Sequence, residues 1–195
     1  MNEIAKLGII LFIITAIAAG ILAFSNDMTK DLIIEVEEAA SSGPEVANAV
    51  IPGSVGFEKY DENVIEKIKS ENDKFIDLKI GKDENGNITG YAIRTLSPKA
   101  GYGGDIEIFL GISPEGEIVG MKVLSLSETP GLGSNVQNPE FQQQYFDKNT
   151  DMTIEVTKAE PAENEIVAVA GATISSRSIT SAVNNAIDIF NEYVK

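Results

Sequence analysis

Residues 106–126 read IEIFLGISPEGEIVGMKVLSL, and this stretch decides the fold. Every second residue from Ile106 to Ile112 is an isoleucine or a leucine, so one face of an extended strand would carry only large apolar side chains. Residues 113–116, Ser-Pro-Glu-Gly, have the composition of a turn, and residues 118–126 are again rich in apolar and β-branched side chains. The stretch therefore predicts an antiparallel hairpin with one buried face.

A second pair of strand patterns precedes this hairpin. Ile76, Leu78 and Ile80 alternate with other residues, residues 83–86 (Asp-Glu-Asn-Gly) form a turn, and residues 87–95 form the returning strand. The two hairpins together predict an antiparallel meander. Weaker strand patterns follow at residues 152–157 and 166–169.

Helical patterns lie on both sides of the predicted sheet. A short one contains Val64, Ile65 and Ile68, and a long one closes the chain, with Ser175 or Ser176 as its expected N-cap. The apolar stripe of the last helix comprises Ile179, Ala182, Val183, Ala186, Ile187, Phe190 and Val194. We therefore expect an α+β fold, a mostly antiparallel sheet flanked by helices.

Residues 7–24 read LGIILFIITAIAAGILAF and carry no charge. A helix of this length spans about 27 Å at ~1.5 Å per residue, enough to cross the hydrocarbon core of a bilayer. We interpret the segment as a retained transmembrane helix. A signal peptide with a cleavage-like site at residues 16–18, Ala-Ile-Ala, is the alternative.

The charges on either side of this helix predict its orientation. Residues 1–6 carry the α-amino group and Lys6, whereas the segment after the helix is acidic. The positive-inside rule then places residues 1–6 in the cytoplasm and the rest of the chain on the extracytoplasmic side of the cell membrane. From Thr29 onward the apolar residues have helical spacing until Ser-Ser-Gly-Pro at 41–44, so we assign residues 25–47 to a connecting amphipathic helix and residues 48–195 to one domain.

The composition excludes several functions. A formal charge of −15 and a pI of about 4.3 argue against nucleic-acid partners. The chain has no cysteine and no histidine, so it has no disulfide, thiolate zinc site or protein-ligated iron–sulfur cluster, and no Ser/His/Asp or Cys/His catalytic arrangement. We predict no catalytic residue and no metal site, and any redox chemistry would need an organic cofactor.

Two loops have unusual sequences. Residues 127–134 read SETPGLGS, in which Pro130-Gly131 suits a tight turn and Gly133 permits close approach of the backbone to another group. Residues 170–177 read AGATISSR and lie just before the final helix, whose first amide groups and dipole favour an anion such as a phosphate. Taken singly, each loop has the ordinary composition of a connection or a helix cap.

Taken in order, the motifs Gly-Tyr-Gly-Gly at 101–104, Glu-Thr-Pro-Gly-Leu-Gly at 128–133 and Gly-Ala-Thr at 171–173 resemble those of the FMN-binding domain family. Its best-known members are the G subunit of the Rnf complex and the C subunit of the sodium-pumping NADH:quinone reductase. The resemblance spans the whole chain, including the N-terminal anchor. The shortness of the chain favours the Rnf type.

The resemblance implies that Thr173 carries FMN through a phosphoester bond made by a separate flavin transferase. It also implies that Thr129 and Leu132 border the isoalloxazine ring and that Gly131 lets the backbone approach it. The remaining expected binding residues are Tyr102, Glu128, Gly171, Ala172, Ile174, Ser175 and Ser176.

Two positions depart from the family pattern Asp-x-x-Ser/Thr-Gly-Ala-Thr. Val167 stands where the aspartate is expected, and Ala170 stands where the hydroxyl residue is expected. We expect Glu165, two residues before Val167, to take over part of the role of the aspartate.

The function that the resemblance implies is electron transfer within a membrane complex that links ferredoxin and NAD to Na⁺ or H⁺ transport, with no turnover by this subunit alone. The anchor would dock against other membrane subunits, through Gly8 and Gly20. The alternatives are the C-type subunit of the reductase, an anchored extracytoplasmic sensor or ligand-binding domain, and a pilin-like structural subunit.

Overall fold

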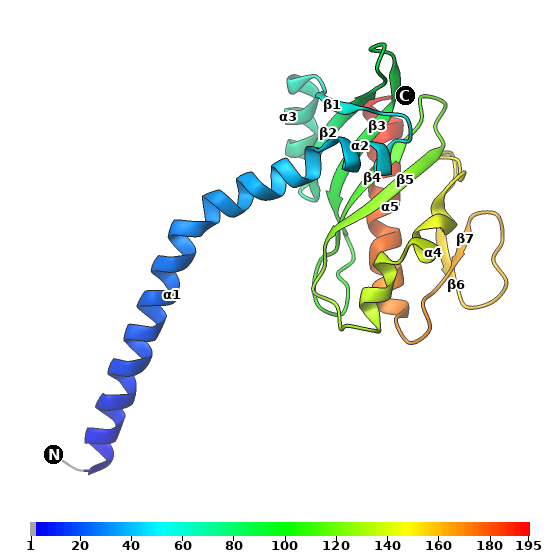
Figure 1. The fold of residues 1–195 in the computed structure, drawn as a ribbon. Coiled ribbons are helices and arrows are strands. Elements are labelled where there is room, and N and C mark those ends of the chain that lie inside the picture. The colour runs from blue at the N-terminus through cyan, green and yellow to red at the C-terminus, as the bar shows by residue number, and fades with distance from the viewer. Residues whose placement is uncertain (1–2) are drawn as a thin grey trace. The chain divides into compact units, whose positions relative to one another are not determined.

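The computed structural model describes the backbone of residues 3–195, and the side chains of these residues except 31–42 and 44 (Figure 1). The chain divides into two compact units, residues 1–41 and residues 42–195.

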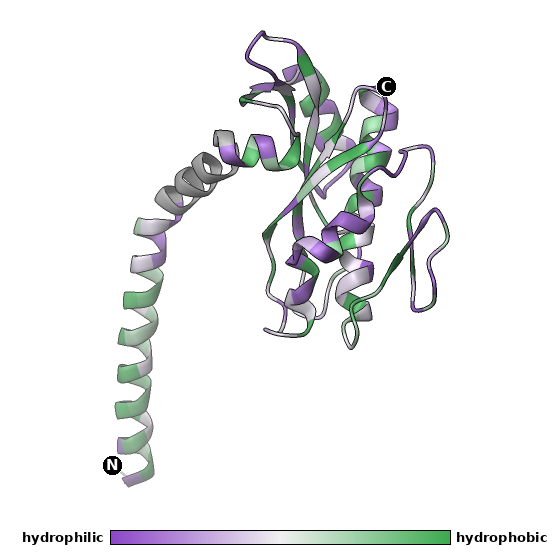
Figure 2. Cartoon of the chain, turned by 45° about the vertical axis from the view of Figure 1, so that its right-hand side comes forward, coloured by the Kyte–Doolittle hydropathy of each residue, from purple (hydrophilic) through white to green (hydrophobic). Residues whose placement is uncertain are grey.

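The first unit is formed by helix α1 (Glu3–Ser42), and its apolar part is the predicted membrane segment. Large side chains such as Leu11 and Phe12 are well exposed along this helix, and Figure 2 shows that most residues of its N-terminal part are hydrophobic. The hydroxyl of Thr15 donates to the Leu11 carbonyl at 3.0 Å, which satisfies a polar group within the apolar segment. Residues 3–30 are long and apolar enough to cross a bilayer, as the sequence predicted.

The predicted connecting helix over residues 25–47 is wrong in its limits. Helix α1 continues without a break to Ser42, and a separate short helix, α2 (Pro44–Val50), follows after Gly43. Pro44 has no N–H to donate and occupies the first turn of α2, where none is needed, so it ends one helix and begins the next. Helix α2 belongs to the second unit.

The second unit is built on a five-stranded sheet in the order β1-β2-β3-β4-β5, in which all neighbours are antiparallel. The predicted meander is therefore confirmed, with β2 (Phe75–Lys82), β3 (Ile88–Leu96), β4 (Glu107–Ile112) and β5 (Ile118–Ser125) at the expected places. The edge strand β1 (Gly56–Lys59) has only four residues, two of them charged, and gives no alternating pattern in the sequence.

One face of the sheet packs against the C-terminal helix α5 (Thr173–Tyr193) and helix α3 (Glu62–Glu71). The main core lies in this layer. Its fully buried side chains include Ile68 from α3, Ile93 and Leu110 from the sheet, and Ile179 and Phe190 from α5. Burying this much apolar surface is the main stabilising contribution in the fold.

The prediction of a single buried face is wrong, because α2 covers the other face. Val46 and Val50 of α2 form a second small core there with Phe109 of β4. Gly111 makes this contact possible, since a β-carbon at position 111 would overlap the Val50 carbonyl oxygen. Because α2 covers this face, β4 is buried on both sides, although large aliphatic residues occupy only every second position of its sequence.

The remaining elements lie between β5 and α5. Two 3-10 turns, η1 (Gly133–Gln137) and η2 (Gln143–Tyr145), flank the short helix α4 (Pro139–Gln142). Two three-residue strands, β6 (Glu155–Thr157) and β7 (Glu165–Val167), follow and form a small parallel sheet of their own. Because β6 and β7 run in the same direction, the segments that leave both strands lie at the same end of this pair.

Candidate functional site

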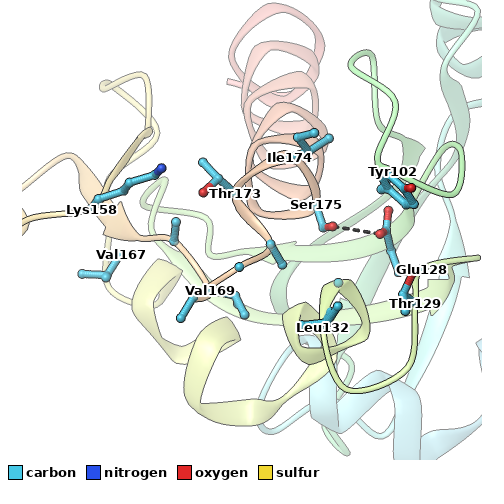
Figure 3. Close-up of a pocket in the computed structure, with 15 residues that line it drawn as sticks. Tyr102, Glu128, Thr129, Leu132, Lys158, Val167, Val169, Thr173, Ile174 and Ser175 are labelled. Atoms are coloured by element: carbon cyan, nitrogen blue, oxygen red, sulfur yellow. Dashed lines mark hydrogen bonds between the residues drawn. The ribbon is translucent and has the colours of Figure 1, made fainter.

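A cavity of about 820 Å³ opens beside the first turn of α5 (Figure 3). It lies between the start of α5, the loop after β5 and the ends of β6 and β7. Its volume falls within the range of about 300–1,000 Å³ that is usual for small-molecule sites. The lining residues are Tyr102, Glu128, Thr129, Leu132, Gly133, Lys158, Val167, Ala168, Val169, Ala170, Gly171, Ala172, Thr173, Ile174 and Ser175.

This lining includes every residue that the sequence nominated for the site except Gly131 and Ser176. The three motifs at 101–104, 128–133 and 171–173 are far apart in the chain, and the fold brings them around one space. The sequence did not indicate the contribution of Lys158, which belongs to none of the motifs, or of Ala168 and Val169, which occupy the two positions that the family pattern leaves open.

Thr173 is the first residue of α5, and the helix begins without a side-chain cap. Ala172 is the N-cap residue and has no side chain that could accept a hydrogen bond from the first turn. The backbone N–H groups of Thr173, Ile174 and Ser175 have no acceptor among the described residues, and neither does the hydroxyl of Thr173. An uncapped start with free donors is the arrangement that favours a bound anion.

The expectation that Ser175 or Ser176 caps this helix is wrong. Both residues lie inside the first turn and are buried. The Ser176 hydroxyl accepts from the Val169 N–H and donates to the Ala172 carbonyl, each at 3.0 Å. Ser176 therefore stabilises the segment between β7 and α5 through these two hydrogen bonds, and it does not line the cavity.

Glu128 is a buried residue that connects two segments of the site by hydrogen bonds. Its side chain is only 7% exposed. One carboxylate oxygen accepts from the Ser175 hydroxyl at 2.8 Å, and the other accepts from the Gly103 backbone N–H at 3.3 Å. The carboxylate thus joins the loop at 101–104 to the first turn of α5, and Figure 3 shows it between Tyr102 and Ser175.

Gly131 and Gly133 have different roles in the loop after β5. Gly131 has a φ of +76° and occupies the third position of a tight turn that the Leu132 N–H closes on the Thr129 carbonyl. A β-carbon at position 131 would meet no protein atom within 4 Å, and the approach of the Gly131 backbone to a flavin ring stays a prediction. The close approach expected at Gly133 is present within the protein, because a β-carbon there would lie 2.6 Å from the Ser175 hydroxyl and would overlap Glu128.

Three large apolar side chains stand at the cavity with much of their surface uncovered. Tyr102 is 77% exposed, Leu132 is 50% exposed and Ile174 is 57% exposed. Val167 and Val169 add apolar surface from the β7 side (Figure 3). A flat apolar ligand would cover surface that is costly to leave in water.

The two departures from the family motif also lie in this lining. Val167 is held by its backbone, which exchanges two hydrogen bonds with the Gln144 side chain, so its own side chain contributes only apolar surface. Glu165 does not line the cavity, and its carboxylate accepts from the Ala162 N–H at 2.9 Å. Its expected share in the role of the aspartate stays a prediction.

The residues fit a flavin mononucleotide. The free donors and the Thr173 hydroxyl supply a phosphate site, the exposed apolar side chains supply surface for a ring system, and the cavity is large enough for both. Lys158 and Glu128 are the charged residues of the lining, and Lys158 is its cation.

Comparisons with known proteins agree with this geometry. The family model of the FMN-binding domain matches residues 101–188. The G subunit of the Na(+)-translocating ferredoxin:NAD(+) oxidoreductase complex of Acetobacterium woodii is 34% identical, over 97% of this chain and 93% of that protein. The G subunit of an ion-translocating oxidoreductase complex of Methanosarcina acetivorans is 29% identical, over 96% and 94%.

A solved structure has the same fold. The crystal structure of NqrC from Shewanella oneidensis superposes with a TM-score of 0.53 over 74% of this chain and 69% of that chain, at 18% sequence identity. At this identity the likeness concerns the fold alone.

Proposed function

This chain belongs to the family of G subunits of ion-translocating oxidoreductase complexes, which contain the FMN-binding domain, and we propose that it carries FMN covalently on Thr173. It is a flavin electron-transfer subunit of a membrane-bound ferredoxin:NAD oxidoreductase complex, as its relatives' names indicate. The observation that carries the covalent attachment is the unpartnered Thr173 hydroxyl at the uncapped start of α5, beside a cavity of suitable volume.

The attachment is a phosphoryl-transfer reaction. The Thr173 oxygen attacks the phosphorus of a flavin nucleotide activated as a phosphoanhydride, a new O–P ester bond forms, and the anhydride P–O bond breaks. The hydroxyl proton passes to solvent, and the second phosphate group of the anhydride departs. A separate flavin transferase would catalyse this step, because the described residues of the cavity include no general base beside Thr173.

In the loaded protein the side chains position and enclose the cofactor. The N–H groups of Thr173, Ile174 and Ser175 would hold the phosphate, and Glu128 keeps the first turn of α5 fixed against the loop at 101–104. Thr129 and Leu132 would border the ring system. When bound, FMN supplies the ability to accept and pass on electrons one at a time.

The N-terminal helix anchors this carrier to the cell membrane as a single-pass subunit. We place residues 1–6 in the cytoplasm and the flavin domain on the extracytoplasmic side, because Lys6 precedes the helix and acidic residues follow it. A covalent link suits a carrier in this position, since a dissociable flavin would be lost by dilution. Other membrane subunits would contact the helix, including the faces around Gly8 and Gly20.

Among the alternatives, the C-type subunit of the sodium-pumping NADH:quinone reductase is supported only by fold, at 18% identity. The G subunits match nearly the whole chain at 29–34% identity. The sensor and pilin-like alternatives offer no account of a free threonine hydroxyl beside a cavity lined by three flavin-family motifs.

Flavin fluorescence of the chain on a denaturing gel tests the attachment. Co-expression with a flavin transferase should give a fluorescent band and an intact mass raised by one FMN less one water. Thr173→Ala should abolish both signals, whereas the matched control Thr173→Ser should retain them because it keeps the hydroxyl. Fluorescence that survives in Thr173→Ala would refute attachment at this residue.

A further inference from the structure

The small β6–β7 sheet brings one unexpected cation to the flavin cavity. Lys158 follows β6 directly, and the segment 168–173 follows β7. The pair is parallel, with Thr157 opposite Val167, and the Ala168 N–H donates to the Thr157 carbonyl at 2.9 Å. Lys158 therefore leaves its strand at the same end as the segment that leads to Thr173.

The Lys158 side chain is directed toward the part of the cavity where Thr173 lies (Figure 3). Its ammonium group makes no hydrogen bond or ion pair with any described residue. The segment from Glu155 to Glu165 also contains four glutamates, and none of them lines the cavity. Lys158 alone among the charged residues of this segment faces the site.

The charges of the cavity are thus separated. Glu128 lies on the Tyr102 side, where the Ser175 hydroxyl and the Gly103 N–H already occupy its carboxylate. Lys158 lies on the Thr173 side, and no described residue pairs with it. An ammonium group binds an anion most favourably when other donors already hold that anion beside it. The entropy cost of ordering the anion is then already covered by those donors, and the ion pair adds to the binding free energy.

We propose that Lys158 is the counter-ion of the flavin phosphate, holding it at the start of α5 before the ester to Thr173 forms and neutralising its charge afterwards. This inference rests on the proposed function. It assigns to Lys158 a positioning role that discriminates between FMN and a flavin without phosphate.

Reversible flavin binding tests the inference without any electron-transfer assay. The parent is the full-length chain with Thr173→Ala, purified in detergent, in which no ester can form. The titrations measure quenching of flavin fluorescence with FMN and, separately, with riboflavin, which has the same ring and no phosphate. The variants on this parent are Lys158→Ala, Lys158→Arg and, as a matched control, Lys122→Ala, an exposed lysine outside the cavity.

We expect Lys158→Ala to raise the Kd for FMN roughly 2–5-fold, the range for a solvent-accessible ion pair, and to leave the Kd for riboflavin unchanged. Lys158→Arg should stay within about twofold of the parent, since it keeps the charge. Added salt should weaken FMN binding to the parent more than to Lys158→Ala. Because Lys158 is exposed, its replacement should leave the circular dichroism spectrum unaltered.

Two results would overturn the inference while leaving the proposed function intact: an unchanged Kd for FMN in Lys158→Ala, or an equal loss for FMN and riboflavin. A parent chain that binds neither flavin, together with a wild-type chain that never becomes fluorescent, would overturn the proposed function and this inference with it.

Discussion

The brace formed by Glu128 gives the sharpest stability prediction. Replacement of Glu128 by alanine removes a hydrogen bond of 2.8 Å from the Ser175 hydroxyl and one of 3.3 Å from the Gly103 N–H. It also leaves the Ser175 hydroxyl, in a residue that is 2% exposed, without its acceptor. The two partners of Glu128, Gly103 and Ser175, belong to segments far apart in the chain. The loss of these hydrogen bonds should therefore lower the free energy of unfolding of the whole domain.

The magnitude follows from the two bonds. A short hydrogen bond to a charged group contributes about 1.5–3 kcal/mol, and the longer bond to Gly103 contributes about 0.5–1 kcal/mol. Since neighbouring contributions are not additive, we expect Glu128→Ala to lower the free energy of unfolding by about 2–4 kcal/mol. Glu128→Gln keeps one oxygen acceptor but loses the charge, and should cost about 1–2 kcal/mol.

Urea unfolding of the full-length chain in detergent, followed by circular dichroism, measures these changes. Glu115→Ala is the matched control, because it removes an exposed glutamate from a turn and should change the free energy of unfolding by less than about 0.5 kcal/mol. A loss below about 0.5 kcal/mol in Glu128→Ala would refute the reasoning, since Ser175 would then have found another partner at no cost.

Three further predictions concern the rest of the domain. Gly111→Ala should lower the free energy of unfolding by about 1–3 kcal/mol, because its β-carbon would push α2 off the sheet, whereas Gly56→Ala, with open space around it, should have little effect in the same urea titration. Asp83 accepts hydrogen bonds from the side chain and backbone of Asn87 and from the Asn85 N–H, which lower the pKa of its carboxyl group. The stabilising contribution of the Asp83 carboxylate should therefore be complete above about pH 4 and be lost as the pH falls through the lowered pKa. The difference in Tm between wild type and Asp83→Asn should accordingly shrink between neutral pH and about pH 2. A difference that stays constant over this range would contradict the prediction. Tyr145→Phe should lower the free energy of unfolding by about 0.5–1.5 kcal/mol in the urea titration, because it removes the buried 2.7 Å hydrogen bond to Thr180. Burial also raises the pKa of the Tyr145 phenol, so the hydroxyl stays protonated. An unchanged urea midpoint would show that this hydrogen bond does not stabilise the domain.

Most of the secondary structure could be predicted because its periodicities are local. The strand pattern from Ile106 to Ile112 and the helical stripe from Ile179 to Phe190 each record, within one segment, which side chains must avoid water. The short strand β1 and the turns between Gly133 and Tyr145 lack a repeating pattern, so no local signal marks them. Pro44 did mark a helix boundary, but the sequence does not say that the helix after it covers the second face of the sheet.

The site could be predicted in part for a different reason. Its motifs contain residue types that a phosphate and a ring system require, and these types are recognisable wherever the motifs fall in the chain. The helix cap was mispredicted, because serine is a common cap residue and its burial beneath the first turn depends on Glu128, Val169 and the core around them. The close contact of the Gly133 backbone with Glu128 and Ser175 likewise depends on residues from other segments of the chain.

The sequence by itself determined the apolar N-terminal helix, the antiparallel meander and the absence of cysteine and histidine, and its motifs nominated Thr173 through their resemblance to the family. Each of these features follows from the residues of one segment or from the overall composition. Only the tertiary structure decided that Glu128, in the loop after β5, joins the loop at 101–104 to α5, and that a parallel pair of three-residue strands places Lys158 at the cavity. These contacts join residues distant in the chain, and their existence follows from packing in three dimensions, which no periodicity along the sequence records.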